Sequence, residues 1–256
     1  MKRIHLLLEF DGSRYGGWQR QDNSLTVQEV VEDALATVVG QRVTVVSSGR
    51  TDAGVHALGM SVHCTVSRVL PITAYREGLN RLLPEDIVVR NAREVAPDFH
   101  ARYSARAKWY RYLLHTGKVR PAMHRLRCWH IRAALDFEEM RKAAGMICGE
   151  HDFRAFTVAS CNASTTVRRV DTIQIDSRGD FVIIDVTGNG FLRYMVRRIA
   201  GTLVEVGSNR RSFDSITQML QHPHKHSAGV TAPAHGLCLM QVLYAGEDLD
   251  FSENFP

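Results

Sequence analysis

Apolar residues in the first half of the chain follow two different spacings. Four short runs rich in Val, Ile and Leu have the length of strands and lie at residues 3–10, 42–47, 60–66 and 86–95. Two segments between these runs repeat apolar residues at helical spacing, at residues 26–40 and 72–83. Gly40 closes the first segment, and Pro71 and Pro84 flank the second. The pattern predicts the order β-α-β-β-α-β, which is a split βαβ unit.

The second half repeats this order with low sequence similarity. Strands are predicted at residues 106–115, 166–176, 180–187 and 237–244. Helices are predicted at residues 136–149, 191–206 and 213–221. The turn Ser177-Arg178-Gly179-Asp180 joins the two middle strands into a hairpin. We therefore expect an α+β chain of two similar halves, residues 1–100 and 101–246, with a cleft between their antiparallel sheets and an acidic tail at 247–256.

Composition excludes several classes of protein. With 256 residues, 45% apolar and 23% charged, the chain matches globular proteins and contradicts a disordered or low-complexity one. No apolar run approaches the ~18 residues of a membrane span, and the N-terminal apolar run is too short for a signal peptide. The five cysteines are scattered and form no C-x-x-C, which argues against a disulfide framework or a zinc ribbon and predicts a cytoplasmic location.

Charge is unevenly distributed along the chain. Lysine and arginine exceed the acids by 32 − 27 = 5, yet residues 99–135 contain no carboxylate. The nine cations of this acid-free segment are Arg102, Arg106, Lys108, Arg111, Lys118, Arg120, Arg125, Arg127 and Arg132. The aromatic residues interleaved with them are Tyr103, Trp109, Tyr110, Tyr112 and Trp129. Because cations contact phosphates and flat rings stack on bases, the segment favours a nucleic acid partner over the alternative, a solvated basic face.

The sequence SSGRTDAGVHALG, residues 47–59, is the strongest candidate for a chemical site. It follows a Val-rich strand and groups three glycines with Arg50, Asp52 and His56. A glycine-rich loop at a strand end can adopt unusual backbone angles and direct a reactive side chain into a cleft. The alternative is a turn-forming Asp52 with a local salt bridge to Arg50. The segment is not a P-loop, because the G-x-x-x-x-G-K-[ST] spacing is absent.

A second group of residues, His222, His224 and His226, consists of side chains that bind transition metals. A metal-dependent hydrolase could use such a group. Pro223 predicts a loop here, however, and no Asp, Glu or Cys at a suitable spacing completes a site. We therefore interpret the group as a solvated histidine-rich loop.

At the Asp52 loop the chain resembles the tRNA pseudouridine synthase A family. The sequence SGRTDAGVHA, residues 48–57, is similar to the catalytic motif of that family. Further similar blocks, in the family's order, are EFDGSRYGGWQRQDNSLTVQEVVEDAL (9–35), FHARYSARAKWYRY (99–112), GEHDFRAF (149–156), NGFLRYMVRRIAGTL (189–203) and TAPAHGLCLMQVLY (231–244). The resemblance spans nearly the whole chain. Small departures from the family pattern occur at Ser47-Ser48, Trp109 and His235.

The resemblance implies an enzyme of two ferredoxin-like halves with a basic central cleft, acting as a homodimer. Such enzymes isomerise uridines at positions 38, 39 and 40 of the tRNA anticodon arm to pseudouridine, without a metal or an organic cofactor. Asp52 would be the catalytic carboxylate, acting either as a nucleophile or as a base at the ribose. A non-catalytic RNA-binding protein built on the same halves is the main alternative, and it would leave the Asp52 loop unexplained.

The resemblance also implies roles for four further residues. Tyr110 would stack on the target uracil, and Arg197 would pair with Asp52 and keep it ionised. Leu237 would form an apolar wall of the pocket, and Arg50 would contact the target nucleotide or help to expel it from the stack. The residues alone allow other interpretations: a cross-strand aromatic for Tyr110, a surface arginine for Arg197, and core packing for Leu237.

Overall fold

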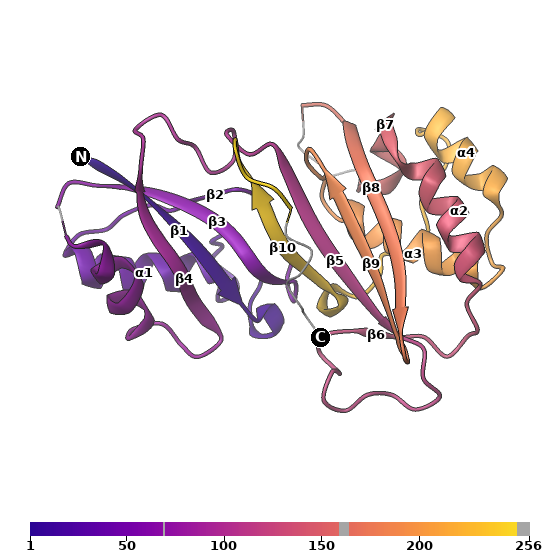
Figure 1. Cartoon of the computed structure of the whole chain (residues 1–256), viewed down its shortest axis with the longest axis horizontal. Coiled ribbons are helices and arrows are strands. Elements are labelled where there is room, and N and C mark those ends of the chain that lie inside the picture. Colours follow the sequence, from indigo (N-terminus) through magenta and orange to yellow (C-terminus); the bar gives the residue numbers. More distant parts are fainter. Residues whose placement is uncertain (69, 159–163, 250–256) are drawn as a thin grey trace. The chain divides into compact units, whose positions relative to one another are not determined.

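The computed structural model describes residues 1–68, 70–158 and 164–249, which form two compact units (Figure 1). The first unit comprises Met1–Arg106 together with the described chain from Cys238 onward, and the second comprises Ala107–Leu237. Both units combine antiparallel strands with helices, which confirms an α+β fold. No helix of the described residues has the length and apolarity needed to cross a membrane. Cys161 and most of the expected acidic tail lie outside the described residues.

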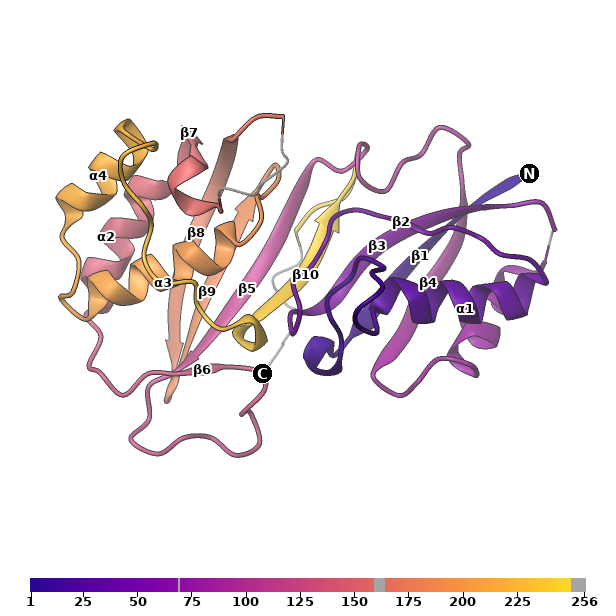
Figure 2. The ribbon, with the colours of Figure 1, turned by 180° about the vertical axis from the view of Figure 1, so that it is seen from behind.

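The first unit contains an antiparallel sheet with the strand order β4-β1-β3. Its three long strands are β1 (Lys2–Phe10), β3 (His56–Val66) and β4 (Ile87–Val95). The short β2 (Val46–Ser47) pairs antiparallel with β3, and β10 (Leu237–Leu243) pairs parallel with it. Helix α1 (Val27–Val39) covers one face of this sheet (Figures 1 and 2). The strand predicted at residues 237–244 is therefore present as β10, but it joins the sheet of the first unit, whereas the sequence predicts that it belongs to the second half.

Helix α1 begins and ends where the sequence predicts. Thr26 Oγ1 accepts a hydrogen bond from Glu29 N, and this bond satisfies one of the free N–H groups of the first turn. Gly40 adopts a left-handed conformation with φ of 81°, which ends the helix.

The strand predicted at residues 42–47 is wrong except at its end, where β2 forms. Val45 N donates to Glu32 Oε1 at 3.0 Å, and Val45 O accepts from Gln28 Nε2 at 3.3 Å. Because side chains of α1 satisfy this backbone, no strand ladder is needed there. Val43 and Val45 are buried all the same, and this alternation of buried and exposed residues is why the run resembles a strand in the sequence.

The helix predicted at residues 72–83 is shorter than expected. Residues 72–80 are helical and include the π-helical turn Ala74–Gly78. Asn80 ends the helix by bonding both backbone groups of Val89 on β4: its Nδ2 donates to Val89 O at 3.0 Å, and its Oδ1 accepts from Val89 N at 2.7 Å. The helix end is therefore tied to the sheet by one side chain.

The second unit contains an antiparallel sheet with the strand order β5-β9-β8-β7. These strands are β5 (Ala107–His115), β7 (Gly149–Asp152), β8 (Val167–Arg178) and β9 (Phe181–Gly188). The short β6 (Trp129–His130) runs parallel to the end of β5. Three helices lie on one side of the sheet (Figures 1 and 2): α2 (Phe137–Ile147), α3 (Met195–Gly207) and α4 (Phe213–Gln221). The predicted hairpin is confirmed, with Arg178 opposite Phe181.

Helix α3 begins later than the predicted residue 191. Tyr194 has a φ of 64°, in the left-handed region, so the right-handed helix cannot extend through it towards the N-terminus. Residues 189–194 therefore form a loop that leads into the helix. Arg197 lies in the first turn of α3 as a consequence.

Candidate active site

Asp52 lies in a tight turn between β2 and β3. Val55 N donates to Asp52 O at 3.1 Å and closes the turn. Gly54 has a φ of 79°, a backbone conformation that residues with a side chain rarely adopt. On the other side of Asp52, Ser48 N donates to Ser61 O at 2.8 Å and ties the loop to β3. Asp52 as a whole residue is half-buried, and these two bonds fix the backbone around it.

A second part of the chain, the opening segment (residues 12–18), is hydrogen-bonded to this turn. Trp18 N donates to Thr51 O at 3.1 Å, and Gly54 N donates to Tyr15 O at 3.4 Å. These bonds join the opening segment to the backbone on both sides of Asp52. Trp18 itself is buried, so the segment is anchored in the core of the first unit.

Two glycines allow the two backbones to approach this closely. A Cβ on Gly17 would lie 2.6 Å from Thr51 O, and a Cβ on Gly12 would lie 2.0 Å from Val55 O. Any side chain at either position would push the opening segment away from the Asp52 turn. The family resemblance includes Gly12 and Gly17 without implying a role for them, although glycines beside Trp18 are a sequence signal for a close backbone approach.

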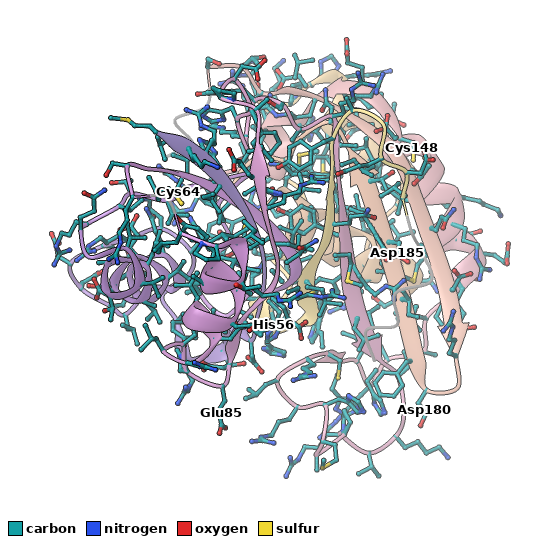
Figure 3. All side chains as sticks on the ribbon, turned by 60° about the vertical axis from the view of Figure 1, so that its left-hand side comes forward. His56, Cys64, Glu85, Cys148, Asp180 and Asp185 are labelled. Atoms are coloured by element: carbon teal, nitrogen blue, oxygen red, sulfur yellow. The ribbon has the colours of Figure 1, made fainter. Side chains whose placement is uncertain are left out.

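Two buried polar side chains flank Asp52. The imidazole of His56, labelled in Figure 3, accepts a hydrogen bond at Nδ1 from Gly12 N at 3.1 Å. Thr51 Oγ1 is buried and has no hydrogen-bond partner among the described residues. An unpartnered buried hydroxyl costs about 1–3 kcal/mol. Thr51, the residue before Asp52, therefore has unused hydrogen-bonding capacity.

Tyr110 lies on β5 in the second unit, where its side chain is 8% exposed. Its ring meets the ring of Phe191 edge to face, with centroids 5.3 Å apart and an angle of 86° between the planes. Phe191 belongs to the loop before α3. The ring is thus held by an aromatic neighbour, which suits core packing as well as stacking on a base, and the stacking role stays a prediction.

Arg197 is held in place by its own unit. Its Nε donates to Ala232 O at 2.7 Å, and Ala232 N donates to Arg197 O at 3.2 Å. Its Cζ lies 5.1 Å from the centroid of the Tyr194 ring, within the range of a cation–π contact. The left-handed Tyr194 therefore places its ring beside the guanidinium. The predicted pairing of Arg197 with Asp52 stays a prediction.

The segment before β10 connects Arg197 with Tyr112 and Leu237. Tyr112 Oη donates to Pro233 O at 2.8 Å, and a Cβ on Gly236 would lie 2.6 Å from Tyr112 Cζ. Burial raises the pKa of Tyr112 well above its usual value, and the charge of Arg197 acts in the opposite direction. Leu237 follows at the start of β10 and is 5% exposed. Tyr112 thus links Arg197 with the segment that leads to Leu237. From the sequence, Tyr112 is only one of the aromatic residues of the acid-free segment.

The predicted site residues are divided between the two units. Asp52 and Arg50 belong to the first unit, where Arg50 is exposed. Tyr110, Arg197 and Leu237 belong to the second.

One cation of the acid-free segment is not at the surface. Arg111 is 5% exposed, and its Nε and Nη2 donate to the two carboxylate oxygens of Asp185, each at 2.9 Å. Trp109 Nε1 donates to the same carboxylate at 2.7 Å (Figure 3 labels Asp185). Arg111 is opposite Asp185 in the β5–β9 register. Arg111 therefore adds less to the positive charge of the acid-free segment than the sequence suggests, because a buried carboxylate already pairs with its guanidinium.

The histidine-rich loop does not gain ligands from elsewhere in the described chain. Among residues 1–68, 70–158 and 164–249, no three His, Cys, Asp or Glu side chains are grouped so that they could hold a metal ion. His222 ends α4, His224 lies in the turn that follows, and His226 comes directly after this turn.

The chain belongs to the tRNA pseudouridine synthase family. The family model described as "tRNA pseudouridine synthase" matches residues 7–104 and 143–245, which include the Asp52 turn, the opening segment and Arg197. Members of this family are isomerases that act on uridines of tRNA, and this chain is an enzyme of that class.

Two similar proteins carry the name "tRNA pseudouridine synthase A". The one from Syntrophotalea carbinolica is 51% identical over 248 residues, covering 97% of this chain and 98% of its own. The one from Pelobacter propionicus is 50% identical over 244 residues, covering 95% of this chain and 100% of its own. A chain in the crystal structure of an archaeal box H/ACA sRNP Nop10-Cbf5 complex aligns over 79% of this chain and 43% of its own, with 14% identity and a TM-score of 0.36.

Proposed function

We propose that this enzyme converts uridines at positions 38, 39 and 40 of the tRNA anticodon arm to pseudouridine, with Asp52 as the catalytic carboxylate. The observation that carries the assignment of Asp52 is the fixation of its turn by the opening segment. Hydrogen bonds reach the backbone on both sides of Asp52, and Gly12 and Gly17 permit the close approach. Such precise support is what a reacting group requires, because a misplacement of about 1 Å can cost about 10²-fold in rate.

The chemistry needs a carboxylate and consumes nothing. The N1–C1′ glycosidic bond of uridine breaks, the uracil turns, and its C5 bonds to C1′. The proton leaves C5, and N1 gains a proton, so the overall reaction is an isomerisation. An ionised Asp52 can begin this path as a nucleophile or as a base at the ribose. Because no electron or water is transferred, we propose that the enzyme uses neither a metal nor an organic cofactor.

The roles that the resemblance assigns to the other residues are part of the proposal. Tyr110 stacks on the uracil, Arg197 keeps the catalytic carboxylate ionised, Leu237 provides an apolar wall, and Arg50 contacts the target nucleotide. The fixed guanidinium of Arg197 and the exposure of Arg50 support two of these roles. The contact between Tyr110 and Phe191 supports a rigid ring, which loses little entropy when a base stacks on it.

We further propose that the chain consists of two ferredoxin-like halves, residues 1–100 and 101–246, with the acidic tail 247–256, and acts as a cytoplasmic homodimer. In this division the last strand of the second half, β10, is the one that pairs with β3 of the first. The order of strands and helices in the first unit supports the ferredoxin-like assignment. The proposed cytoplasmic location rests on the proposed substrate, tRNA. Sedimentation of the purified protein measures the dimer, and a monomer at working concentration would contradict it.

The decisive experiment incubates the enzyme with unmodified tRNA and maps pseudouridine at single-nucleotide resolution. The variant Asp52→Asn keeps the size of the side chain and removes the nucleophile and base, so product formation should fall by several orders of magnitude while tRNA binding persists. Asp33→Asn is the matched control, because Asp33 lies on the exposed face of α1, 3.9 Å from Arg42, and its change should leave the rate unaltered. Pseudouridine formation by Asp52→Asn at the wild-type rate would remove Asp52 from the site. A wild-type enzyme that binds tRNA and forms no pseudouridine would favour the non-catalytic RNA-binding alternative.

A further inference from the structure

The loop between β5 and β6, residues 116–128, is firmly held at its base. Thr116 N donates to Asp180 O at 2.8 Å, and His130 Nε2 lies 2.8 Å from Gly117 O. Cys128, at the far end of the loop, is buried with Leu113 and Ile183. Figures 1 and 2 show the rest of the loop extending beyond the ends of the strands of the second unit, and Figure 3 labels Asp180 at its base. The loop is thus an anchored projection.

The projecting part of the loop carries cations without ion-pair partners. Lys118, Arg120 and Arg125 are exposed, and no carboxylate among the described residues forms an ion pair with any of them. Some exposed cations on other elements are paired with carboxylates. Arg14 pairs with Asp86 at 2.7 Å, for example, and Lys142 pairs with Glu139 at 2.8 Å.

Exposed apolar side chains lie between these cations. Val119 is 78% exposed and Met123 is 88% exposed. Three cations without counter-charges produce a strong positive potential, which attracts a polyanion. Apolar side chains between them suit a partner with flat or apolar surface between its charges. A nucleic acid has both features, because riboses and bases alternate with phosphates.

The loop is far from the residue proposed to stack on the target base. Thr116 lies six positions after Tyr110, just beyond the end of β5, and at about 3.3 Å per residue this extended segment spans about 20 Å. A distance of 20 Å corresponds to about six base pairs of a duplex at 3.4 Å each. A nucleotide that contacts the loop is therefore separated from the target uridine by about the length of six base pairs.

We propose that the 116–128 loop binds the sugar-phosphate backbone of tRNA outside the anticodon arm, through Lys118, Arg120 and Arg125. The loop increases the affinity for whole tRNA and does not touch the reacting uridine. The proposal rests on the proposed function for its substrate and for the place of Tyr110. It adds a second contact region that selects a complete tRNA over a short hairpin.

The test compares two RNAs and two variants. Lys118→Gln/Arg120→Gln/Arg125→Gln removes the three loop cations, and Arg76→Gln/Arg141→Gln/Lys142→Gln removes three exposed cations that have ion-pair partners. Filter binding over a salt series measures the Kd of each for whole tRNA and for the isolated anticodon arm. Single-turnover rates at saturating RNA measure the chemical step.

The loop variant should bind whole tRNA at least tenfold more weakly, and its slope of log K against log[salt] should be smaller by about 2 to 3, since each phosphate contact contributes about 0.7–0.9. Its affinity for the isolated arm and its single-turnover rate should equal those of the wild type, and the control variant should match the wild type on both RNAs. Equal losses on both RNAs, or no loss on either, would overturn the proposal. A change in sedimentation with unchanged RNA affinity would instead show that the loop contacts a second copy. Failure of the proposed function can be distinguished from failure of the loop proposal. If the proposed function is wrong, the wild-type enzyme forms no pseudouridine, and the comparison of tRNA affinities between the two variants can still be made.

Discussion

Replacing Gly17 by Ala tests whether the opening segment positions the catalytic carboxylate. Gly17 has a φ of 100°, and an added Cβ would lie 2.6 Å from Thr51 O. The unfavourable φ costs about 1–3 kcal/mol. The collision costs about 1–3 kcal/mol more, because a backbone oxygen cannot rotate away as a flexible side chain can. We therefore expect Gly17→Ala to lower the free energy of unfolding by about 2–6 kcal/mol.

The collision also has a direction, because relief requires the opening segment and the Asp52 turn to move apart. A displacement of Asp52 by about 1 Å would lower the rate of the chemical step by about 10²-fold. Binding of tRNA should change little, since neither Gly17 nor Thr51 adds or removes a charge. The expected signature of Gly17→Ala is therefore a large loss in single-turnover rate at a nearly constant Kd.

Gly179→Ala is the matched control for the backbone strain. Gly179 also has a positive φ, 57°, but a Cβ there would meet no atom within 4 Å. This variant should lose stability from the φ alone and keep the wild-type rate. Both variants are assayed well below their melting temperatures, so that the folded fraction is near one. A folded Gly17→Ala enzyme with the wild-type single-turnover rate would refute the positioning role of the opening segment.

Two further predictions concern single side chains. Tyr110→Phe keeps the ring and should bind tRNA normally. Tyr110→Ala loses the stacking surface, which is worth about 1–3 kcal/mol per base, and should be the more impaired of the two in a single-turnover assay. Full activity of Tyr110→Ala would remove Tyr110 from the site. Gly145 lies on the exposed face of α2, where an added Cβ would meet nothing within 4 Å. Gly145→Ala should therefore stabilise the protein by about 0.5–1 kcal/mol in thermal unfolding. A lower melting temperature would contradict the assigned helix.

The sequence predicts those elements whose ends have local chemical signals. Thr26 and Gly40 delimit α1, and the Ser177–Asp180 turn marks the hairpin of β8 and β9. Where a tertiary contact decides, the prediction is wrong. Residues 42–47 look like a strand because they are apolar, but the side chains of Gln28 and Glu32 take their backbone hydrogen bonds. Neither partner is adjacent in sequence, so spacing alone does not reveal the exchange.

The candidate site shows the same division. Asp52 was predictable because a glycine-rich loop and the family motif coincide there. The support of Asp52 by the opening segment was not predictable from the sequence, because contacts between residues 12–18 and the Asp52 turn arise only in the folded chain. The late start of α3 depends on the left-handed Tyr194, a conformation that non-glycine residues adopt rarely and that the helical spacing does not reveal. That conformation also brings the Tyr194 ring to Arg197.

The acid-free segment shows why local charge counting overestimates a binding surface. Residues 99–135 contain no carboxylate, but the antiparallel pairing of β5 with β9 brings Asp185 opposite Arg111 and neutralises it. A loop has no paired neighbouring strand to provide a counter-charge, so Arg120 remains without an ion-pair partner among the described residues.

Two variants that each remove one cation from the same segment should therefore behave in opposite ways. Arg111→Met leaves the carboxylate of Asp185 buried without its arginine, which should cost about 3–5 kcal/mol of stability, and the double variant Arg111→Met/Asp185→Leu should recover most of it. Arg111→Met should keep the wild-type dependence of tRNA affinity on salt wherever it is folded. Arg120→Gln should unfold like the wild type and bind tRNA with a salt slope smaller by about 0.7–0.9. Chemical denaturation measures the stability of both variants, and filter binding measures their salt slopes. A reduced salt slope in folded Arg111→Met would show that the guanidinium of Arg111 reaches phosphate in the wild type despite Asp185. The division of the segment into a buried pair and an exposed contact would then be wrong.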